Sequence, residues 1–224
     1  MKKILFFIPI CFMLSACIEI LDDIKFNADG SGTFKYTINL SSSKVKINSI
    51  LALDSLDGKK VPSKNEIQQK IDEFAAVLSA QEGISNIQID TNYSQFVFKI
   101  QLDFSDVFAL QSGLEQAFKK TIRNLENEEL SYDWISWNGS VLIRKVPDLN
   151  EYGPKSLKTE DSDLLKMGNY TSITRFDNVV SRFENESAQL SKNQRAVMLR
   201  NNIFDVLMDH QIMDNKIYVD STKY

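Results

Sequence analysis

Residues 95–104 carry the sequence QFVFKIQLDF, in which large apolar residues occupy every second position. The even-numbered residues from Phe96 to Phe104 are all apolar, and Lys99, Gln101 and Asp103 lie between them. Successive side chains of a strand point to opposite faces of a sheet. The stretch therefore predicts a strand with one buried face and one face in water.

Two earlier segments repeat this pattern and predict a hairpin. The even-numbered residues of 33–40 are apolar or aromatic, and an apolar stripe also runs through residues 18–26. Between the two segments lies Asp29-Gly30-Ser31-Gly32, whose glycines can adopt a positive φ. The two segments are therefore expected to pair as antiparallel strands.

Helical spacing replaces the alternation in two places. Ser63 and Glu66 have the spacing of a capping box, apolar residues from Ile67 to Leu78 form one stripe, and Gly83 is a candidate terminator. A second helix is expected to begin at Ser105 or Asp106. Its apolar stripe consists of Val107, Leu110, Leu114, Phe118, Ile122 and Leu125.

These elements predict the α+β class, because helices and strands with one apolar face each bury both faces by stacking. We expect a two-layer sandwich in which a mostly antiparallel sheet of about six to nine strands packs against two or three helices. Residues 171–176, 195–199 and 216–219 predict later strands, and 203–208 a short helix. A polar break spans 147–169, and residues 17–224 are expected to form a single domain.

A second hairpin is predicted around Asn138-Gly139, a dipeptide that favours a type I′ turn. A two-residue loop at this position would place Ile135 opposite Leu142. The same register would place Asp133 opposite Arg144, an attractive charge pair.

The amino terminus has the pattern of an export signal. Lys2 and Lys3 precede an apolar run from Ile4 to Met13, which is too short to span a bilayer, and the run ends at Leu14-Ser15-Ala16-Cys17. This last sequence resembles the lipobox of bacterial lipoproteins. The resemblance implies removal of residues 1–16 by cleavage between Ala16 and Cys17, and acylation of Cys17 by chains such as palmitate.

Two or three acyl chains on Cys17 would hold the rest of the chain firmly at a membrane face of the cell envelope. In enterobacterial lipoproteins an aspartate after the cysteine retains the protein at the inner membrane, whereas Ile18 stands here. The outer membrane is therefore the expected location if the cell has two membranes.

Charge and cysteine content exclude several functions. Without residues 1–16 the chain has 24 basic and 30 acidic residues, a net charge of −6, and the basic residues are interspersed with acids. Nucleic acid is therefore not an expected partner, since a phosphate backbone requires clustered Lys and Arg. With Cys11 removed and Cys17 acylated, no thiol remains for disulfides or metal binding. We expect no cofactor and no metal site, because the sequence contains no matching motif.

Catalytic candidates are few, and no enzymatic activity is expected. His210 is the single histidine, and no nucleophile motif accompanies it. Paired carboxylates can hydrolyse glycosidic bonds, which makes a cell-wall glycan hydrolase a third hypothesis. Solvated surface is the expected role of the acidic groups, which are Asp22 with Asp23, Glu126 with Glu128 and Glu129, and Glu160 with Asp161 and Asp163.

Two features suggest binding. Tyr132, Trp134 and Trp137 surround the second hairpin and are candidates for stacking on a ligand, although core packing is the favoured interpretation. The fourteen phenylalanines suggest, as the alternative function, a cup that carries a lipid or another apolar ligand.

Two motifs resemble LppM-type and related lipoprotein domains. One is the turn Asp29–Gly32, a dozen residues after Cys17, and the other is the run Arg175–Val180, followed by Asn185, Ala188 and a strand near Ala196. The resemblance implies an α+β lipoprotein domain with no known enzymatic activity. Together with the lipobox, it leads us to expect a membrane-anchored binding or assembly component whose partners are envelope proteins.

Overall fold

The computed structural model describes residues 18–56, 58–121, 133–146 and 165–220. The helices are α1 (Lys44–Leu51), α2 (Lys64–Ser79), α3 (Val107–Thr121) and α5 (Ile203–Met208), with 3₁₀ turns η1 (Ser41–Ser43) and η4 (His210–Met213). The strands are β1 (Glu19–Phe26), β2 (Gly32–Asn39), β3 (Ser55–Leu56), β4 (Lys59–Lys60), β5 (Ile84–Asn92), β6 (Val97–Phe104), β7 (Ile135–Trp137), β8 (Val141–Arg144), β9 (Asn169–Phe176), β10 (Val180–Phe183), β11 (Gln189–Leu190), β12 (Ala196–Asn202) and β13 (Asn215–Val219).

The predicted α+β class is confirmed, with a mixed main sheet. Seven strands lie in the order β11-β12-β9-β1-β2-β6-β5, and every neighbouring pair is antiparallel except β1 and β9. β1 and β9 run in parallel because the chain re-enters the sheet through a long crossover rather than through a hairpin.

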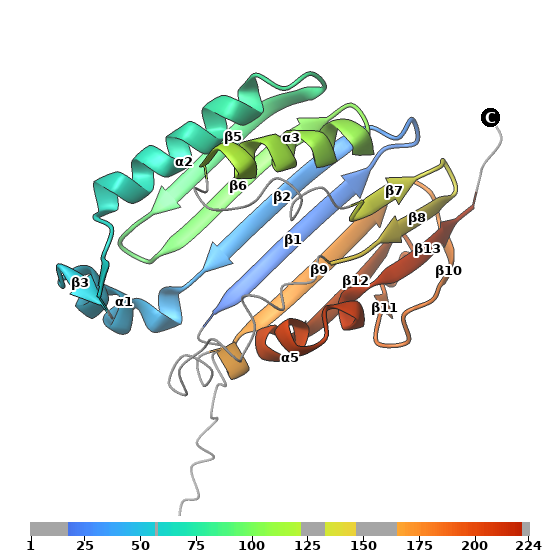
Figure 1. The fold of residues 1–224 in the computed structure, drawn as a ribbon. Coiled ribbons are helices and arrows are strands. Elements are labelled where there is room, and N and C mark those ends of the chain that lie inside the picture. The colour runs from blue at the N-terminus through green and yellow to red at the C-terminus, as the bar shows by residue number, and fades with distance from the viewer. Residues whose placement is uncertain (1–17, 57, 122–132, 147–164, 221–224) are drawn as a thin grey trace, which may run out of the picture.

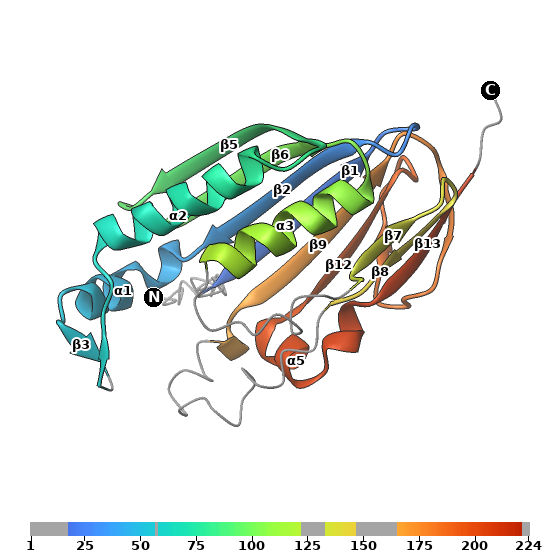
Figure 2. The ribbon, with the colours of Figure 1, turned by 45° about the horizontal axis from the view of Figure 1, so that its top comes forward.

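One face of the main sheet is covered by two kinds of structure. Helices α2 and α3 lie over the β5-β6-β2 side, and a four-stranded sheet in the order β10-β13-β8-β7 lies over the β9-β12 side (Figures 1 and 2). These layers share one apolar core, which includes Phe26, Leu102, Leu110 and Leu142. Among the described elements, none covers the opposite face, which we call the outer face.

The seven strands of the main sheet fall within the predicted six to nine, and a four-stranded sheet forms in addition. The second predicted hairpin and the strand at 216–219 pair with each other and join the helical layer instead of extending the main sheet. Alternation of apolar residues marks a strand but does not say which strand it will pair with.

The register of the second hairpin is corrected. Ile135 lies opposite Arg144 rather than Leu142, and Trp137 lies opposite Leu142. The Asn138 side chain accepts hydrogen bonds from the backbone N–H groups of Ser140 and Val141, which makes Gly139-Ser140 the loop. Asp133 consequently does not face Arg144, and its carboxylate accepts a hydrogen bond from Gln111 at 2.9 Å instead.

The strand predicted at 95–104 begins two residues later than expected. β6 starts at Val97, and Phe96 lies in the preceding turn with a φ of +54°, and it is only 2% exposed. From Val97 to Phe104 the alternation holds, and Leu102 and Phe104 are buried while Lys99 is exposed. The first hairpin is confirmed, with Phe26 opposite Gly32 and Gly30 at a φ of +89° in the turn.

The predicted helices form with small differences at their ends. Both hydrogen bonds of the Ser63–Glu66 capping box are present, but α2 ends at Ser79, before Gly83. Asp106 caps α3 by accepting from the Ala109 N–H at 2.8 Å. Leu110 and Leu114 are buried as predicted. In the same stripe Phe118 is 39% exposed, and Ile122 and Leu125 lie outside the described residues.

Several predicted features lie outside the described residues. They are the signal segment with Ala16 and Cys17, most of the polar break, Tyr132, and the acidic groups at 126–129 and 160–163. Within the described ranges, none of the helices has the length and apolarity needed to cross a membrane.

Candidate functional site

Asp22 lies at the centre of the most unusual site in the described structure. It belongs to β1, on the same face as Ile24 and Phe26, and its side chain points between the two sheets with an exposed fraction of 2%. The expectation that Asp22 and Asp23 are both solvated is therefore wrong for Asp22. Strand alternation puts Asp22 on the inner face and Asp23 on the outer face.

The partners of Asp22 come from the other sheet and from a neighbouring strand. Arg144 of β8 donates from Nη2 to Asp22 Oδ2 at 2.7 Å, and the Tyr170 hydroxyl of β9 donates to the same oxygen. The guanidinium of Arg144 also lies 5.9 Å from the centre of the Trp134 ring. We call Asp22, Arg144 and Tyr170 the buried cluster, since it joins the two sheets.

Burial and charge act in opposite directions on these groups. Burial by itself would lower the pKa of Arg144, but the adjacent Asp22 carboxylate raises it, so the guanidinium keeps its charge. Loss of water raises the pKa of Tyr170 well above its usual value of 10, and the negative charge of Asp22 adds to this effect. The same two causes raise the pKa of Tyr36 to about 12.

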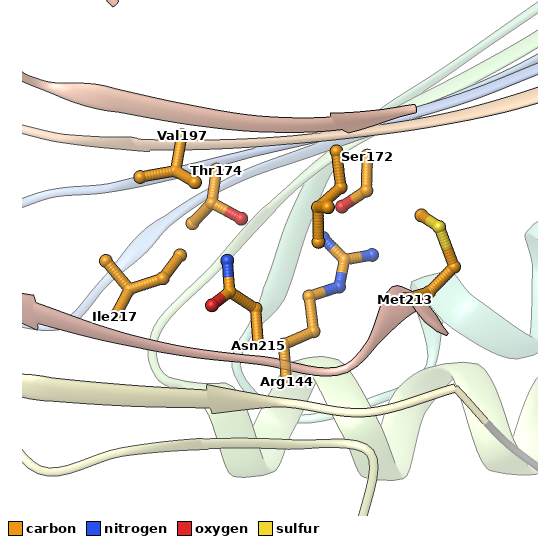
Figure 3. Close-up of a pocket in the computed structure, with 8 residues that line it drawn as sticks. Arg144, Ser172, Thr174, Val197, Met213, Asn215 and Ile217 are labelled. Atoms are coloured by element: carbon orange, nitrogen blue, oxygen red, sulfur yellow. The ribbon is translucent and has the colours of Figure 1, made fainter. Parts of the chain in front are cut away.

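A small cavity adjoins the buried cluster between the two sheets (Figure 3). It leaves about 10 Å³ for the centre of a water molecule, which is the room of a single water and far less than an acyl chain needs. Figure 3 shows that side chains from both sheets and from the turn η4 line it: Arg144, Ser172, Thr174, Val197, Met213, Asn215 and Ile217. Two buried atoms, Arg144 Nη1 and Asp22 Oδ1, have no hydrogen-bond partner among the described residues.

The geometry of the buried cluster favours a structural role over acid–base chemistry. Asp22 is held by Arg144 and Tyr170 and is closed off from any external substrate. Asp22 and Asp23 point to opposite faces of β1, so the two carboxylates cannot flank one glycosidic bond. The cluster instead connects β1, β8 and β9 at a single point.

The outer face is open and carries charged and hydroxyl side chains, with Leu21, Ile173 and Met198 among them. Arg175 of β9 donates three hydrogen bonds to Asp23: from Nε to Oδ1 at 2.8 Å, from Nε to Oδ2 at 3.0 Å and from Nη2 to Oδ2 at 2.9 Å. Asp103 accepts from Asn86 and Thr33, and these hydrogen bonds lower the pKa of its carboxyl group. Charged residues of both signs thus form cross-strand pairs on a face that remains in contact with water.

The aromatic candidates for ligand stacking are partly accounted for by packing. The Trp137 ring stacks 5.4 Å from Phe26 and lies 5.7 Å from Phe176, and a side chain at Gly30 would touch it. Both Trp134 and Trp137 pack against the apolar core and keep some exposure. The favoured interpretation as core packing therefore matches the position of Trp137, whereas Tyr132 lies outside the described residues.

The other candidates contribute no joint site in the described part of the chain. His210 begins the 3₁₀ turn η4. No set of three or more His, Cys, Asp or Glu residues in the described ranges is placed to hold a metal ion.

Sequence reasoning missed the buried cluster, although one signal was present. Asp22 has the same parity as Ile20, Ile24 and Phe26, so a strict alternation places it inside the core. Arg144 likewise shares its parity with the buried Leu142. A charged residue inside an apolar stripe needs a partner of opposite charge, but the sequence does not say where that partner comes from.

The fold and its surfaces define a class: an α+β protein with a mixed seven-stranded sheet that is covered on one face and open on the other. No protein-family model and no curated protein matches the sequence. Among solved structures, the chain is similar to the folded domain of the LppM protein of Mycobacterium tuberculosis, with a TM-score of 0.41, 13% sequence identity and 91% of each chain covered.

Proposed function

We propose that this protein is a lipid-anchored component of the cell envelope that has no enzymatic activity and acts by binding other envelope proteins at a membrane face. Acyl chains on Cys17 provide the anchor, in the outer membrane if the cell has two membranes. The lipobox supports the anchor, and the outer face of the main sheet supports the binding role.

The observation that carries the binding role is the contrast between the two faces of the main sheet. The inner face is closed by two helices and a second sheet, whereas the outer face presents paired charges and hydroxyl groups to water. A protein partner can exchange hydrogen bonds and ion pairs with such a face without any rearrangement of the core. Lys35 of β2 lies at the middle of this face and is exposed.

The inner side gives less support to the alternative of a lipid carrier. A carrier needs an enclosed apolar volume of several hundred Å³. The space beside the buried cluster holds about one water and includes the charged Arg144 among its lining residues. Apolar side chains from both sheets and both long helices fill the described core.

In-cell photo-crosslinking tests the binding role. The crosslinking amino acid p-benzoylphenylalanine replaces Lys35 on the outer face or, as a matched control, Gln116, which is exposed on α3 in the opposite layer. We expect position 35 to give a discrete protein adduct that mass spectrometry identifies, and position 116 to give none. The proposal fails if neither position yields a protein, or if a lipid co-purifies from inside the protein in stoichiometric amount.

The anchor is tested separately with Cys17→Ala. This change should abolish incorporation of a labelled fatty acid and leave an unprocessed or mislocalised precursor. Normal maturation with membrane retention would show that the lipobox interpretation is wrong.

A further inference from the structure

Residues 44–60, which we call the α1–β4 segment, expose apolar side chains in a way that the rest of the fold does not explain. Helix α1 contains no buried residue. Val45 is 79% exposed, Leu53 47% and Leu56 43%. Apolar side chains that gather on one exposed segment mark a surface for contact with another molecule or with a membrane.

The position of the segment follows from the first hairpin. Glu19 pairs with Asn39, so β2 returns the chain to the end of the sheet at which β1 begins. The turn η1 and helix α1 follow at once, and Figure 1 shows α1 and β3 beyond that end of the sheet. Cys17 precedes Glu19 by two residues in the sequence, and two residues of extended chain span at most about 7 Å. The α1–β4 segment therefore emerges next to the attachment point of the proposed anchor.

The charge of the segment indicates which surface it fits. It contains Lys44, Lys46, Lys59 and Lys60 against Asp54 and Asp57, a net charge of +2 in a chain whose net charge is −4. Lys60 also forms an ion pair with Glu66 at the start of α2. Exposed apolar side chains among lysines are typical of segments that insert into the interface of a membrane with anionic lipids.

We propose that the α1–β4 segment lies on the membrane that holds Cys17, with Val45, Leu53 and Leu56 in the interfacial layer and the lysines on anionic headgroups. This inference rests on the proposed lipid anchor and adds a second contact to it. Two contacts at one end of the sheet hold the strands upright from the membrane and keep the outer face accessible to a partner.

Photo-crosslinking of the full-length protein in its membrane tests the inference. We would introduce Val45→p-benzoylphenylalanine and, as a control, Phe108→p-benzoylphenylalanine. Phe108 is 77% exposed, almost as much as Val45, but it follows β6 at the far end of the sheet, where Phe104 pairs with Gly32. We expect lipid adducts from position 45 and background levels from position 108. Neither substitution removes a buried side chain, so both variants should fold.

Charge provides a second readout in the same experiment. Lys46→Ala and Lys59→Ala should each lower the ratio of docked to undocked segment about fivefold, measured as the lipid adduct formed at position 45. Lys120→Ala on α3 is the matched control and should leave the adduct unchanged.

A labelled fatty acid added to the same cells separates failure of the anchor from failure of this inference. Acylated protein whose position 45 yields no lipid adduct, or yields a protein adduct instead, overturns the membrane contact and leaves the anchor intact. Protein that carries no label overturns the anchor and the proposed function. Equal lipid adducts at positions 45 and 108 would also overturn the inference, because they would show contact without orientation.

Discussion

Asp22 and Asp23 are neighbours in β1, and each pairs with an arginine, but on opposite faces of the same sheet. The side chains of Asp22 and Arg144 are 2% and 7% exposed, whereas those of Asp23 and Arg175 are 20% and 46% exposed. The two ion pairs have similar distances, at 2.7 Å and 2.8 Å. Their surroundings differ, and burial decides how much each pair matters to stability, because a charge without a partner is costly only where water cannot reach it.

The largest expected effect comes from breaking the inner pair. Arg144→Met should lower the free energy of unfolding by about 3–5 kcal/mol, because it leaves the Asp22 carboxylate buried without its counter-charge. Urea denaturation of a chain that begins at Ile18 measures this. Arg175→Met on the outer face is the matched control. A loss below about 1 kcal/mol at Arg144 would mean that water reaches Asp22.

Replacing the whole buried cluster distinguishes two contributions to the free energy of unfolding: the cost of a buried charge without its partner, and the net contribution of the intact cluster. The triple change Asp22→Leu, Arg144→Met and Tyr170→Phe should recover the loss and reach or exceed the original stability by about 1–4 kcal/mol, because no buried polar group remains unpaired. The same denaturation experiment tests it. A triple variant as unstable as Arg144→Met alone would show that the cluster contributes net stability.

Alkaline pH acts on the inner face through the tyrosines. The pKa of Tyr36 is about 12 in the folded protein against 10 in the unfolded chain, so the unfolded chain loses its proton first. The resulting contribution to stability is complete below about pH 10 and falls as pH rises toward 12. Tyr36→Phe should therefore reduce the alkaline loss of stability, and denaturation at a series of pH values would show it. Identical pH profiles for both proteins would contradict the prediction.

The smallest effect is expected on the outer face. Asp23→Ala or Arg175→Ala should change the free energy of unfolding by only about 0–1 kcal/mol, and added salt should reduce even this, because both partners remain hydrated. Asp22→Ala, one residue away, is the sharpest control. A loss at Asp23 as large as that at Asp22 would show that something covers the outer face and would remove the basis of the comparison.

Much of the local structure could be predicted because its signals lie within a few residues. The alternation in 97–104, the turn at Asp29–Gly32 and the capping box of Ser63 and Glu66 each involve neighbours in the chain, and all three are present in the fold. The predicted register of the second hairpin was wrong because the loop consists of Gly139-Ser140 instead of Asn138-Gly139. The Asn138 side chain accepts hydrogen bonds from the backbone N–H groups of Ser140 and Val141, and the dipeptide Asn-Gly does not indicate these bonds.

The candidate sites divide in the same way. The open face of β2 and β6 follows from the polar residues at alternate positions, and the export signal with Cys17 is a prediction that rests on a linear motif alone. The inner face could be foreseen only in part. The parity of Asp22 indicates burial, but its partner Arg144 is 122 positions away, as the two residue numbers show.

The sequence by itself determined where the two long helices and most strands of the main sheet form, and which residues mark the proposed anchor. Only the tertiary structure decided that β1 pairs in parallel with β9, that a four-stranded sheet forms beside the helices, and that Arg144 meets Asp22. The physical reason is range. Periodicity and capping act between neighbours, whereas strand pairing and buried charges are settled by the packing of distant segments, which no local pattern encodes.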